Sequence, residues 1–157
     1  MTQQEFAYLL EILSVEFPVR ADDIMVVGMK DLEGRVKQRV FNEHRDSADT
    51  SLGNYKNKEW KRKRVKAGLQ VSEVDLQYTG ALKNSLTTGQ DNKDAYLYFN
   101  DDHQYEKATG QEVINGKKKG KRSAEIWNPT DSEQKEVDQY ILEITEIEVE
   151  KILNKFL

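Results

Sequence analysis

The segment that follows Pro129 carries the most sharply defined pattern in the chain. Thr130 and Glu133 have the spacing of a capping box, in which each residue satisfies a backbone amide at the start of a helix. Apolar residues then recur at helical spacing to the end of the chain: Val137, Tyr140, Ile141, Ile144, Ile147, Ile152 and Phe156. The glutamates lie on other faces: Glu136, Glu143, Glu146 and Glu150. This pattern predicts a long C-terminal helix.

The first third of the chain also has helical periodicity. Residues 3–17 place apolar side chains at helical spacing: Phe6, Leu9, Leu10, Leu13 and Phe17. Pro18 is expected to end this helix, because proline lacks the backbone donor that a helix interior needs. A second helix is predicted from Asp22 to near His44, on the spacing of its aliphatic residues.

The middle of the chain alternates between loop and short regular elements. Residues 45–55 are polar and rich in turn formers, so we expect a loop there. The basic stretch 55–67 consists mostly of good helix formers, and Gly68 follows it as a usual C-terminal stop. This stretch is therefore predicted to be a helix.

Three short strands are predicted from alternating or aromatic residues, at 74–78, 95–99 and 123–127. The residues between the last two strands are polar and punctuated by glycine. This connection is too long for a tight hairpin turn, so we expect a mobile basic loop at about 100–122.

The overall composition limits the class of protein. With 157 residues the chain is predicted to form a single domain, 1–157, and 37% hydrophobic against 33% charged residues predicts a lean core. The absence of cysteine excludes disulfides, thiolate zinc sites and thiol nucleophiles. No apolar run approaches the roughly 20 residues that span a bilayer, so we expect no membrane contact.

The charges are distributed unevenly. Residues 56–66 hold seven Lys or Arg against one acid, and residues 117–122 hold five more. Because the net charge is −4, the rest of the chain must carry −15. Basic projections on an acidic body suit either contact with nucleic acid or docking of copies on one another.

The sequence offers little for catalysis. It has no GxxxxGK[ST] loop and no GxSxG elbow, and the Asp-Asp-His run at 101–103 matches no recognised metal-ligand spacing. A nuclease-like order can be fitted to Pro129, Asp131, Glu133 and Lys135. That motif needs a strand, whereas these residues open a capped helix. We therefore predict a protein that is not an enzyme, with no catalytic residue, no bound metal and no cofactor.

The two basic segments are the candidate contact residues. Aromatic residues interleaved with lysines can stack on bases while the cations hold phosphates. A solvated helix whose Trp60 packs on the core, or contact with an acidic neighbouring subunit, explains the same residues. The candidate interface or nucleic-acid contacts are Lys56, Lys58, Trp60, Lys61, Arg62, Lys63, Arg64, Lys117, Lys118, Lys119, Lys121 and Arg122.

The stretch from Asp75 to Leu86 reads as a corner. Thr79 is a candidate helix N-cap, and Gly80 allows the chain to turn sharply. One helical turn would then direct Leu82 inward, and Ser85 and Leu86 can restart a strand. A structural role alone explains these residues, without a catalytic one.

This Thr-Gly-x-Leu-x-x-Ser motif, formed by Thr79, Gly80, Leu82 and Ser85, resembles that of the phage virion-morphogenesis family. The family comprises tail-completion and head–tail joining proteins, including Mu-like prophage members. The similarity covers approximately residues 30–157, with a basic helix before the motif and a C-terminal helix after it. The region of residues 101–110 departs from the family's usual histidine loop, and the basic residues 117–122 are not typical of it.

The resemblance implies an α+β fold, in which a small antiparallel β-sheet packs against helices, with a long C-terminal helix. It also implies a structural protein that acts in tail completion or head–tail joining through ring assembly. Its partners would be copies of itself and other virion proteins such as connector or tail-tube subunits, with DNA contact possible in the channel. It would be assembled in the bacterial host cytoplasm and located in the virion. The alternative is a small nucleic-acid-binding protein that uses residues 56–66 and 117–122.

Overall fold

The computed structural model describes residues 3–77, 79–91, 94–112 and 126–155. Its elements in chain order are α1 (Gln3–Lys37), the π-helical turn η1 (Gln38–Asn42), α2 (Lys58–Lys66), α3 (Ala81–Ser85), β1 (Leu86–Gln90), β2 (Ala95–Phe99), α4 (Asp102–Glu112) and α5 (Asp131–Leu153). The fold is α+β, with one antiparallel pair of strands and a long C-terminal helix. The predicted fold class is confirmed.

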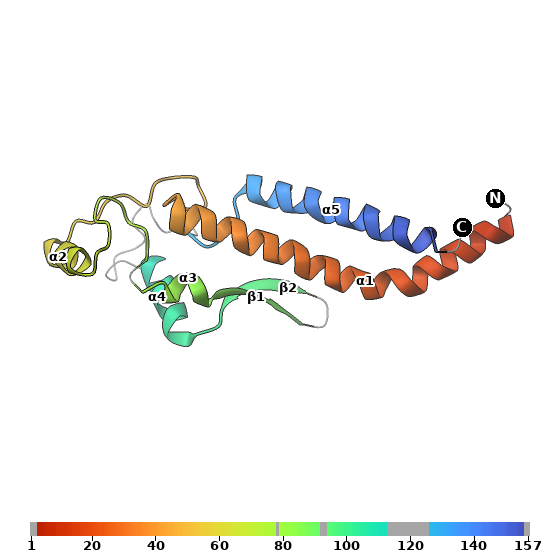
Figure 1. The fold of residues 1–157 in the computed structure, drawn as a ribbon, viewed down its shortest axis with the longest axis horizontal. Coiled ribbons are helices and arrows are strands. Elements are labelled where there is room, and N and C mark those ends of the chain that lie inside the picture. The colour runs from red at the N-terminus through yellow and green to blue at the C-terminus, as the bar shows by residue number, and fades with distance from the viewer. Residues whose placement is uncertain (1–2, 78, 92–93, 113–125, 156–157) are drawn as a thin grey trace.

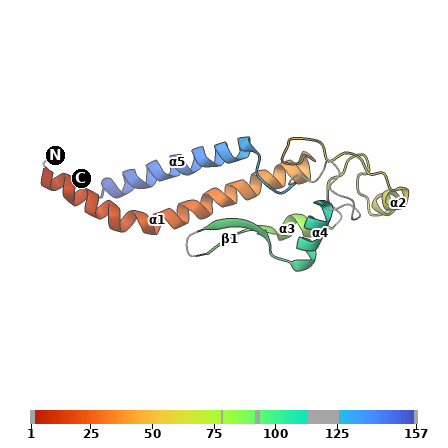
Figure 2. The ribbon, with the colours of Figure 1, turned by 180° about the vertical axis from the view of Figure 1, so that it is seen from behind.

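The molecule is elongated, and α1 runs along most of its length (Figure 1). Helix α5 lies antiparallel beside α1, and the β1–β2 hairpin lies along the other side of α1. Figure 2 shows the same order from behind, with α2 at the end of the molecule opposite the start of α1. The long axis therefore separates the basic helix α2 from the far end of the α1–α5 pair.

The α1–α5 contact is close because α1 has a glycine where the two helices meet. A Cβ added to Gly28 would lie 2.5 Å from Cγ1 of Ile141, well inside contact distance. The pairing extends from Arg39 beside Glu133 to Glu16 beside Lys155. The first turns of α1 therefore continue past the C-terminal end of α5, as Figure 1 shows.

The β1–β2 hairpin pairs Leu86 with Phe99 at its base. Its outer face is covered by Tyr96 and Tyr98, whose rings would lie within 3 Å of a Cβ on Gly89. The inner face packs Leu86, and the partly buried Phe99, against the core. The strand predicted at 95–99 and the restart at Leu86 are confirmed.

The core is small and lies where α1, α5 and the hairpin meet the turn before α5. It contains Leu32, Val36, Val40, Phe41, Leu52, Leu86, Ile126 and Val137. The ring of Trp127 packs edge-on against that of Phe99, with 5.1 Å between the ring centroids. The lean core expected from composition is consistent with these few buried residues.

Pro18 does not end the first helix, so this prediction is wrong. Helix α1 continues through Pro18 to Lys37 and absorbs the first two predicted helices. A proline inside a helix removes one hydrogen bond and bends the axis, and the helix resumes where the following residues favour it. Residues 19–23 contain no glycine and no further proline, so no strong helix breaker follows Pro18. Figure 1 shows α1 changing direction in its N-terminal part.

The strand predicted at 74–78 is also wrong for the residues described, and Tyr78 lies outside them. Leu76 has a positive φ of 52°, which an extended strand does not allow. Asp75, which alternation would place on the outer face, is buried at 6% exposure instead. Asp75 instead forms an ion pair with the buried Arg64, described below, and this contact is incompatible with the predicted strand.

Part of the loop expected at 100–122 is helix α4. Asp101 accepts a hydrogen bond from the backbone nitrogen of Gln104 at 2.8 Å and so caps the start of this helix. Gln104 and Ala108, one turn apart, are buried. The residues 117–122 lie outside the described part of the chain. Of the strand predicted at 123–127, only the final two residues are described, and they form a turn.

Two further predictions for the helices are confirmed. Both capping-box hydrogen bonds between Thr130 and Glu133 are present at the start of α5. The basic stretch forms α2, after which Gly68 adopts a positive φ of 71°. Phe156, predicted on the apolar face of α5, lies outside the described residues. Among the helices that the structure describes, none has both the length and the apolar character needed to cross a bilayer.

Candidate interaction surfaces

The Thr79–Ser85 motif forms a corner between a loop and the hairpin. Gly80, with φ of 77°, is the N-cap of α3, while Thr79 accepts a hydrogen bond from the backbone of Ala81 at 3.3 Å. The cap predicted for Thr79 therefore belongs to Gly80. Leu82 packs against the core, and the Ser85 hydroxyl donates to the carbonyl of Leu82 at 2.9 Å. Each residue of the motif therefore has a structural role here.

Arg64 attaches α2 to the segment that follows it. The guanidinium is 1% exposed and donates to Asp75 Oδ2 at 2.7 Å and to the carbonyl of Gln70 at 2.8 Å. It also donates to the carbonyl of Gln77 and lies over the Tyr55 ring, 4.5 Å from the centroid. Because this group is enclosed, Arg64 is not available for the partner contact predicted for it.

The same network shifts the pKa values of two groups. Burial raises the pKa of Tyr55 to about 12, and the hydrogen bond that Tyr55 donates to Asp75 adds to the increase. Burial also acts to raise the pKa of Asp75. Hydrogen bonds from Gln77, Gln70 and Tyr55, together with the charge of Arg64, outweigh it and hold that pKa below its usual value. Tyr55 is therefore neutral and Asp75 ionised around pH 7.

The other candidate residues in and just before α2 face solvent to different extents. Lys56, Lys58, Arg62 and Lys63 are exposed, whereas Lys61 is half-buried. Trp60 is 37% exposed, so its side chain is partly packed against the protein and partly in solvent. The second candidate set, Lys117, Lys118, Lys119, Lys121 and Arg122, lies outside the described residues.

The structure brings the corner and the basic helix together. Thr79, Gly80 and Leu82 line one hollow of about 390 Å³ with Trp60 and Arg64. Only Ser85 of the motif is turned away from it, toward the hairpin, where its carbonyl accepts from the Asn100 backbone at 2.9 Å. The Thr79–Ser85 corner and the basic helix α2, which are separate features in the sequence, therefore lie at the same end of the molecule.

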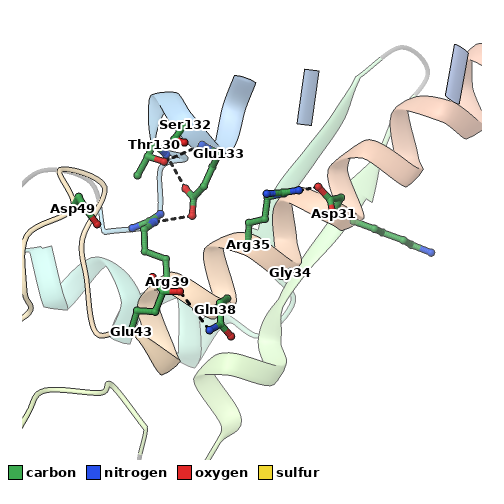
Figure 3. Close-up of a pocket in the computed structure, with 11 residues that line it drawn as sticks. Asp31, Gly34, Arg35, Gln38, Arg39, Glu43, Asp49, Thr130, Ser132 and Glu133 are labelled. Atoms are coloured by element: carbon green, nitrogen blue, oxygen red, sulfur yellow. Dashed lines mark hydrogen bonds and ion pairs between the residues drawn. The ribbon is translucent and has the colours of Figure 1, made fainter. Parts of the chain in front are cut away.

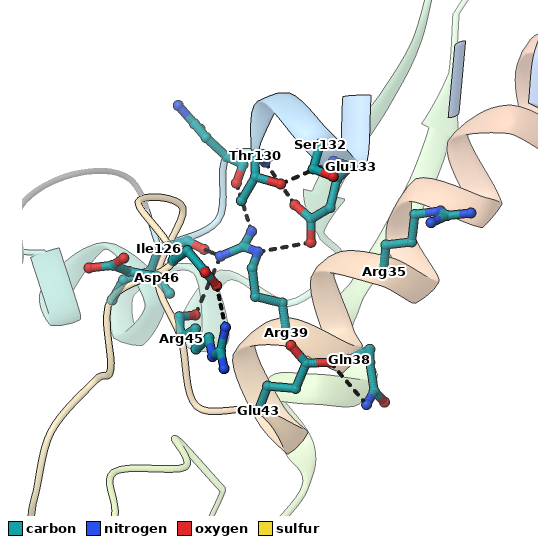
Figure 4. A network of polar contacts seen from close by, with 12 residues as sticks. Arg35, Gln38, Arg39, Glu43, Arg45, Asp46, Ile126, Thr130, Ser132 and Glu133 are labelled. Atoms are coloured by element: carbon teal, nitrogen blue, oxygen red, sulfur yellow. Dashed lines mark hydrogen bonds and ion pairs between the residues drawn. The ribbon is translucent and has the colours of Figure 1, made fainter. Parts of the chain in front are cut away.

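A larger polar hollow, of about 700 Å³, lies between the C-terminal part of α1 and the start of α5 (Figure 3). Arg39 stands in its wall and is 5% exposed. It donates to Glu133 Oε1 at 2.8 Å, to the carbonyl of Asn128 at 2.7 Å and to that of Ile126 at 3.1 Å (Figure 4). Through these contacts Arg39 holds the start of α5 in place. The polar residues around this hollow therefore have a structural role, and no ligand is needed to explain them.

We found no metal-binding arrangement of side chains in the described part of the chain. No group of three or more His, Asp or Glu side chains there is placed to hold a metal ion. Asp101 caps α4, and His44 pairs with Glu73 at 2.7 Å. Glu133, the central acid of the nuclease-like order, is committed to Arg39 and to the capping box.

The solvent-facing side of α5 is strongly acidic. The helix holds eight Asp or Glu residues against two Lys. Glu143, Glu146 and Glu150 are exposed and share one face, because they follow each other at intervals of three and four. A shallow groove on this face is lined by these glutamates and by Ile147. The sequence pattern placed Ile147 on the apolar face and the glutamates on other faces, whereas Ile147 is 51% exposed and lines this groove with them.

Large apolar side chains also reach solvent along the α1–α5 arm. The exposed ones on the first half of α1 are Phe6, Tyr8, Leu10, Val15 and Val19. Val19 is 71% exposed, although it lies within a regular helix. Phe6 and Leu10 are one turn apart, as are Val15 and Val19, so these side chains form two short apolar stripes that suit contact with another protein.

The chain matches no family model, and neither a curated protein nor a solved structure is significantly similar to it. Function is therefore inferred from the exposed surfaces of α1, α2 and α5.

Sequence reasoning missed the roles of Arg39 and Arg64. Arg39 follows Val36 by three residues and so continues the buried stripe of α1, a signal that could have identified it as an enclosed cation. Arg64 gave no such sign within a run of lysines and arginines. Its ion-pair partner, Asp75, was predicted on the outer face of a strand in a separate segment, so no sequence pattern connects the two.

Proposed function

We propose that this chain is a non-enzymatic structural subunit of a phage or prophage particle, which acts in tail completion or head–tail joining through assembly into rings. The observation that carries the proposal is the exposed apolar surface of the α1–α5 arm. Side chains such as Phe6, Leu10 and Val19 gain nothing from water, and burial against another subunit would stabilise them. The resemblance of the Thr79–Ser85 corner to the virion-morphogenesis motif supports the choice of particle.

The shape of the molecule supports the same proposal. A short core and a long two-helix arm leave a large part of the surface for contacts with other subunits. The two best-formed polar networks, around Arg39 and Arg64, serve to hold elements in place. This arrangement suits a building block whose work is done at its interfaces.

Assembly of the purified protein tests the proposal. We expect oligomers of uniform size by light scattering after size-exclusion chromatography, and rings by negative-stain electron microscopy. A chain that stays monomeric at every accessible concentration, and does not associate with the products of neighbouring genes, would contradict the proposal. The neighbouring genes are expected to encode portal, capsid and tail-tube proteins, and a housekeeping neighbourhood would count against a particle.

Nucleic-acid binding is the second candidate, and the exposed cations of α2 favour it. Lys58, Arg62 and Lys63 are exposed on α2, which lies at one end of the molecule. Phosphate contacts of this kind weaken as salt concentration rises. Salt-dependent binding to DNA by the monomer, reduced by Lys61→Ala, Arg62→Ala and Lys63→Ala together, would support this candidate over ring assembly.

A further inference from the structure

The exposed side of α2 is a basic stripe with an apolar residue beside it. Lys58, Arg62 and Lys66 are exposed and follow each other at intervals of four, so they lie along one face of the helix. Val65 stands next to this stripe and is 62% exposed. A stripe of cations around an accessible aliphatic side chain suits an acidic protein surface that offers an apolar contact at its centre.

The outer face of α5 has the opposite character. Glu143, Glu146 and Glu150 surround Ile147, which is 51% exposed, and Leu142 beside them is exposed to the same degree. In the part of the chain that the structure describes, no Lys, Arg or His forms an ion pair with any of these three glutamates. Three like charges therefore stand close together without a compensating cation.

The two surfaces cannot neutralise each other within one molecule. Helix α2 lies at one end of the long axis, and the half of α5 that carries these glutamates points toward the other end (Figures 1 and 2). Arg64 and its contacts with Asp75 fix α2 in that position. Among the described residues, therefore, neither surface meets its complement within the same molecule.

We propose that α2 of one copy binds the outer face of α5 in the next copy, with Lys58, Arg62 and Lys66 opposite Glu143, Glu146 and Glu150. This inference rests on the ring assembly proposed above and identifies its contact. The two surfaces differ, so the contact is heterologous and leaves one free surface of each kind on a dimer. Repetition of such a contact closes into a ring when the rotation allows it.

A second copy fits these surfaces better than the other candidate occupants. A symmetric contact of α2 with α2, or of α5 with α5, would place like charges opposite each other, which is unfavourable. Nucleic acid would satisfy α2 but would leave the three glutamates uncompensated. A second copy satisfies both surfaces, with Val65 beside Ile147 as the apolar centre.

Charge reversal on each surface tests the contact. One variant carries Lys58→Glu, Arg62→Glu and Lys66→Glu, and the other carries Glu143→Lys, Glu146→Lys and Glu150→Lys. We expect each variant alone to lose assembly, with an apparent dissociation constant raised at least about tenfold in sedimentation velocity. Lys30→Glu with Lys135→Glu, at exposed lysines outside both surfaces, should assemble like the unaltered chain.

Mixing the two reversed variants provides the decisive measurement. Each would then meet a partner of opposite charge at both of its surfaces, so the mixture should assemble with alternating subunits. A chain that carries all six reversals should likewise assemble on its own. Circular dichroism of each variant separates loss of contact from loss of folding, because rescue by mixing requires folded partners.

The remaining outcomes separate this inference from the proposal beneath it. If the unaltered chain forms rings and both reversed variants form them equally well, the α2–α5 contact is overturned and ring assembly stands. If the unaltered chain never assembles, both are overturned. If reversal of α2 abolishes DNA binding and leaves assembly unchanged, α2 is a nucleic-acid surface and the contact is overturned.

Discussion

Arg39 and Arg64 are both almost fully buried, and each is held by one carboxylate and by backbone carbonyls. Arg39 joins the end of α1 to the start of α5, and Arg64 joins α2 to the segment around Asp75. A guanidinium can donate in several directions at once, so one residue can satisfy several carbonyls of irregular backbone. In a chain with a small core, these two side chains replace apolar contacts.

Replacing Arg64 by Met should destabilise the α2 end of the molecule by about 3 kcal/mol, because it leaves the buried carboxylate of Asp75 without its cation. Faster amide hydrogen exchange across residues 55–77 would report the loss. Arg62→Met is the matched control, since Arg62 is exposed on the same helix and its loss should cost less than about 0.5 kcal/mol. Equal protection in both variants would contradict the anchoring role of Arg64.

Stability should fall in alkaline solution as Tyr55 ionises. Its pKa is raised from 10.0 to about 12 in the folded protein, so folding favours the neutral form. The resulting stabilisation is fully present below pH 10.0 and is lost as the pH rises toward about 12. Ultraviolet titration of the unaltered chain minus Tyr55→Phe should show one phenol that ionises near pH 12. A difference curve centred near pH 10 would show that Tyr55 is not enclosed.

Two glycines of α1 should respond to alanine with opposite signs. Gly28→Ala would place a Cβ 2.5 Å from Ile141 and push α5 away, so we expect a loss of about 1–3 kcal/mol. Gly34→Ala meets nothing within 4 Å and should add about 0.5–1 kcal/mol through higher helix propensity. Urea unfolding of both variants checks the pair. A loss at both sites would mean that α1 is crowded along its whole length.

At the scale of elements, the sequence predicted what depends on neighbouring residues. The capping box and apolar repeat of α5, the basic helix α2 and the aromatic strand β2 follow from local patterns, and all are present. The failures involve contacts between distant segments. Asp75 forms an ion pair with Arg64 where a strand was predicted. Helix α4 lies where a loop was predicted, with Gln104 and Ala108 buried on one side of it.

Pro18 shows the limit of a local rule in a different way. Its ring does remove a hydrogen bond, yet α1 continues on both sides because α5 and the hairpin pack against the residues that follow. The candidate contact residues were identified as a set, but the sequence could not separate Arg64 from the exposed cations around it. That separation depends on a carboxylate eleven residues away.

The start of α5 gives a graded prediction for one element. Thr130→Ala removes the hydrogen bond to the backbone of Glu133 and should cost about 1 kcal/mol. Glu133→Ala should cost about 3 kcal/mol or more, because it removes the other half of the box and leaves Arg39 buried without its carboxylate. Thermal and urea unfolding would rank the two. Equal losses would show that Arg39 finds compensation elsewhere.

For the whole molecule, the position of the core decides which parts serve stability and which serve contacts. The apolar core lies where α1, α5 and the hairpin meet, and the α2 end is held by the polar contacts of Arg64 instead. One end carries the basic helix α2, and the other carries the first turns of α1 beyond the end of α5. Alterations at the ends should therefore affect assembly more than folding.

Removal of residues 1–13 tests this division. Of the described residues in this segment, none is fully buried, and the pairing with α5 begins near Glu16, so the truncated chain should unfold within a few degrees of the full chain. The same truncation removes the exposed Phe6 and Leu10, and assembly should therefore weaken in sedimentation velocity. Phe6→Ser with Leu10→Ser in the full-length chain should reproduce this weakening without shortening α1. A large fall in melting temperature on truncation would mean that these turns stabilise the monomer, and unchanged assembly would exclude them from the subunit interface.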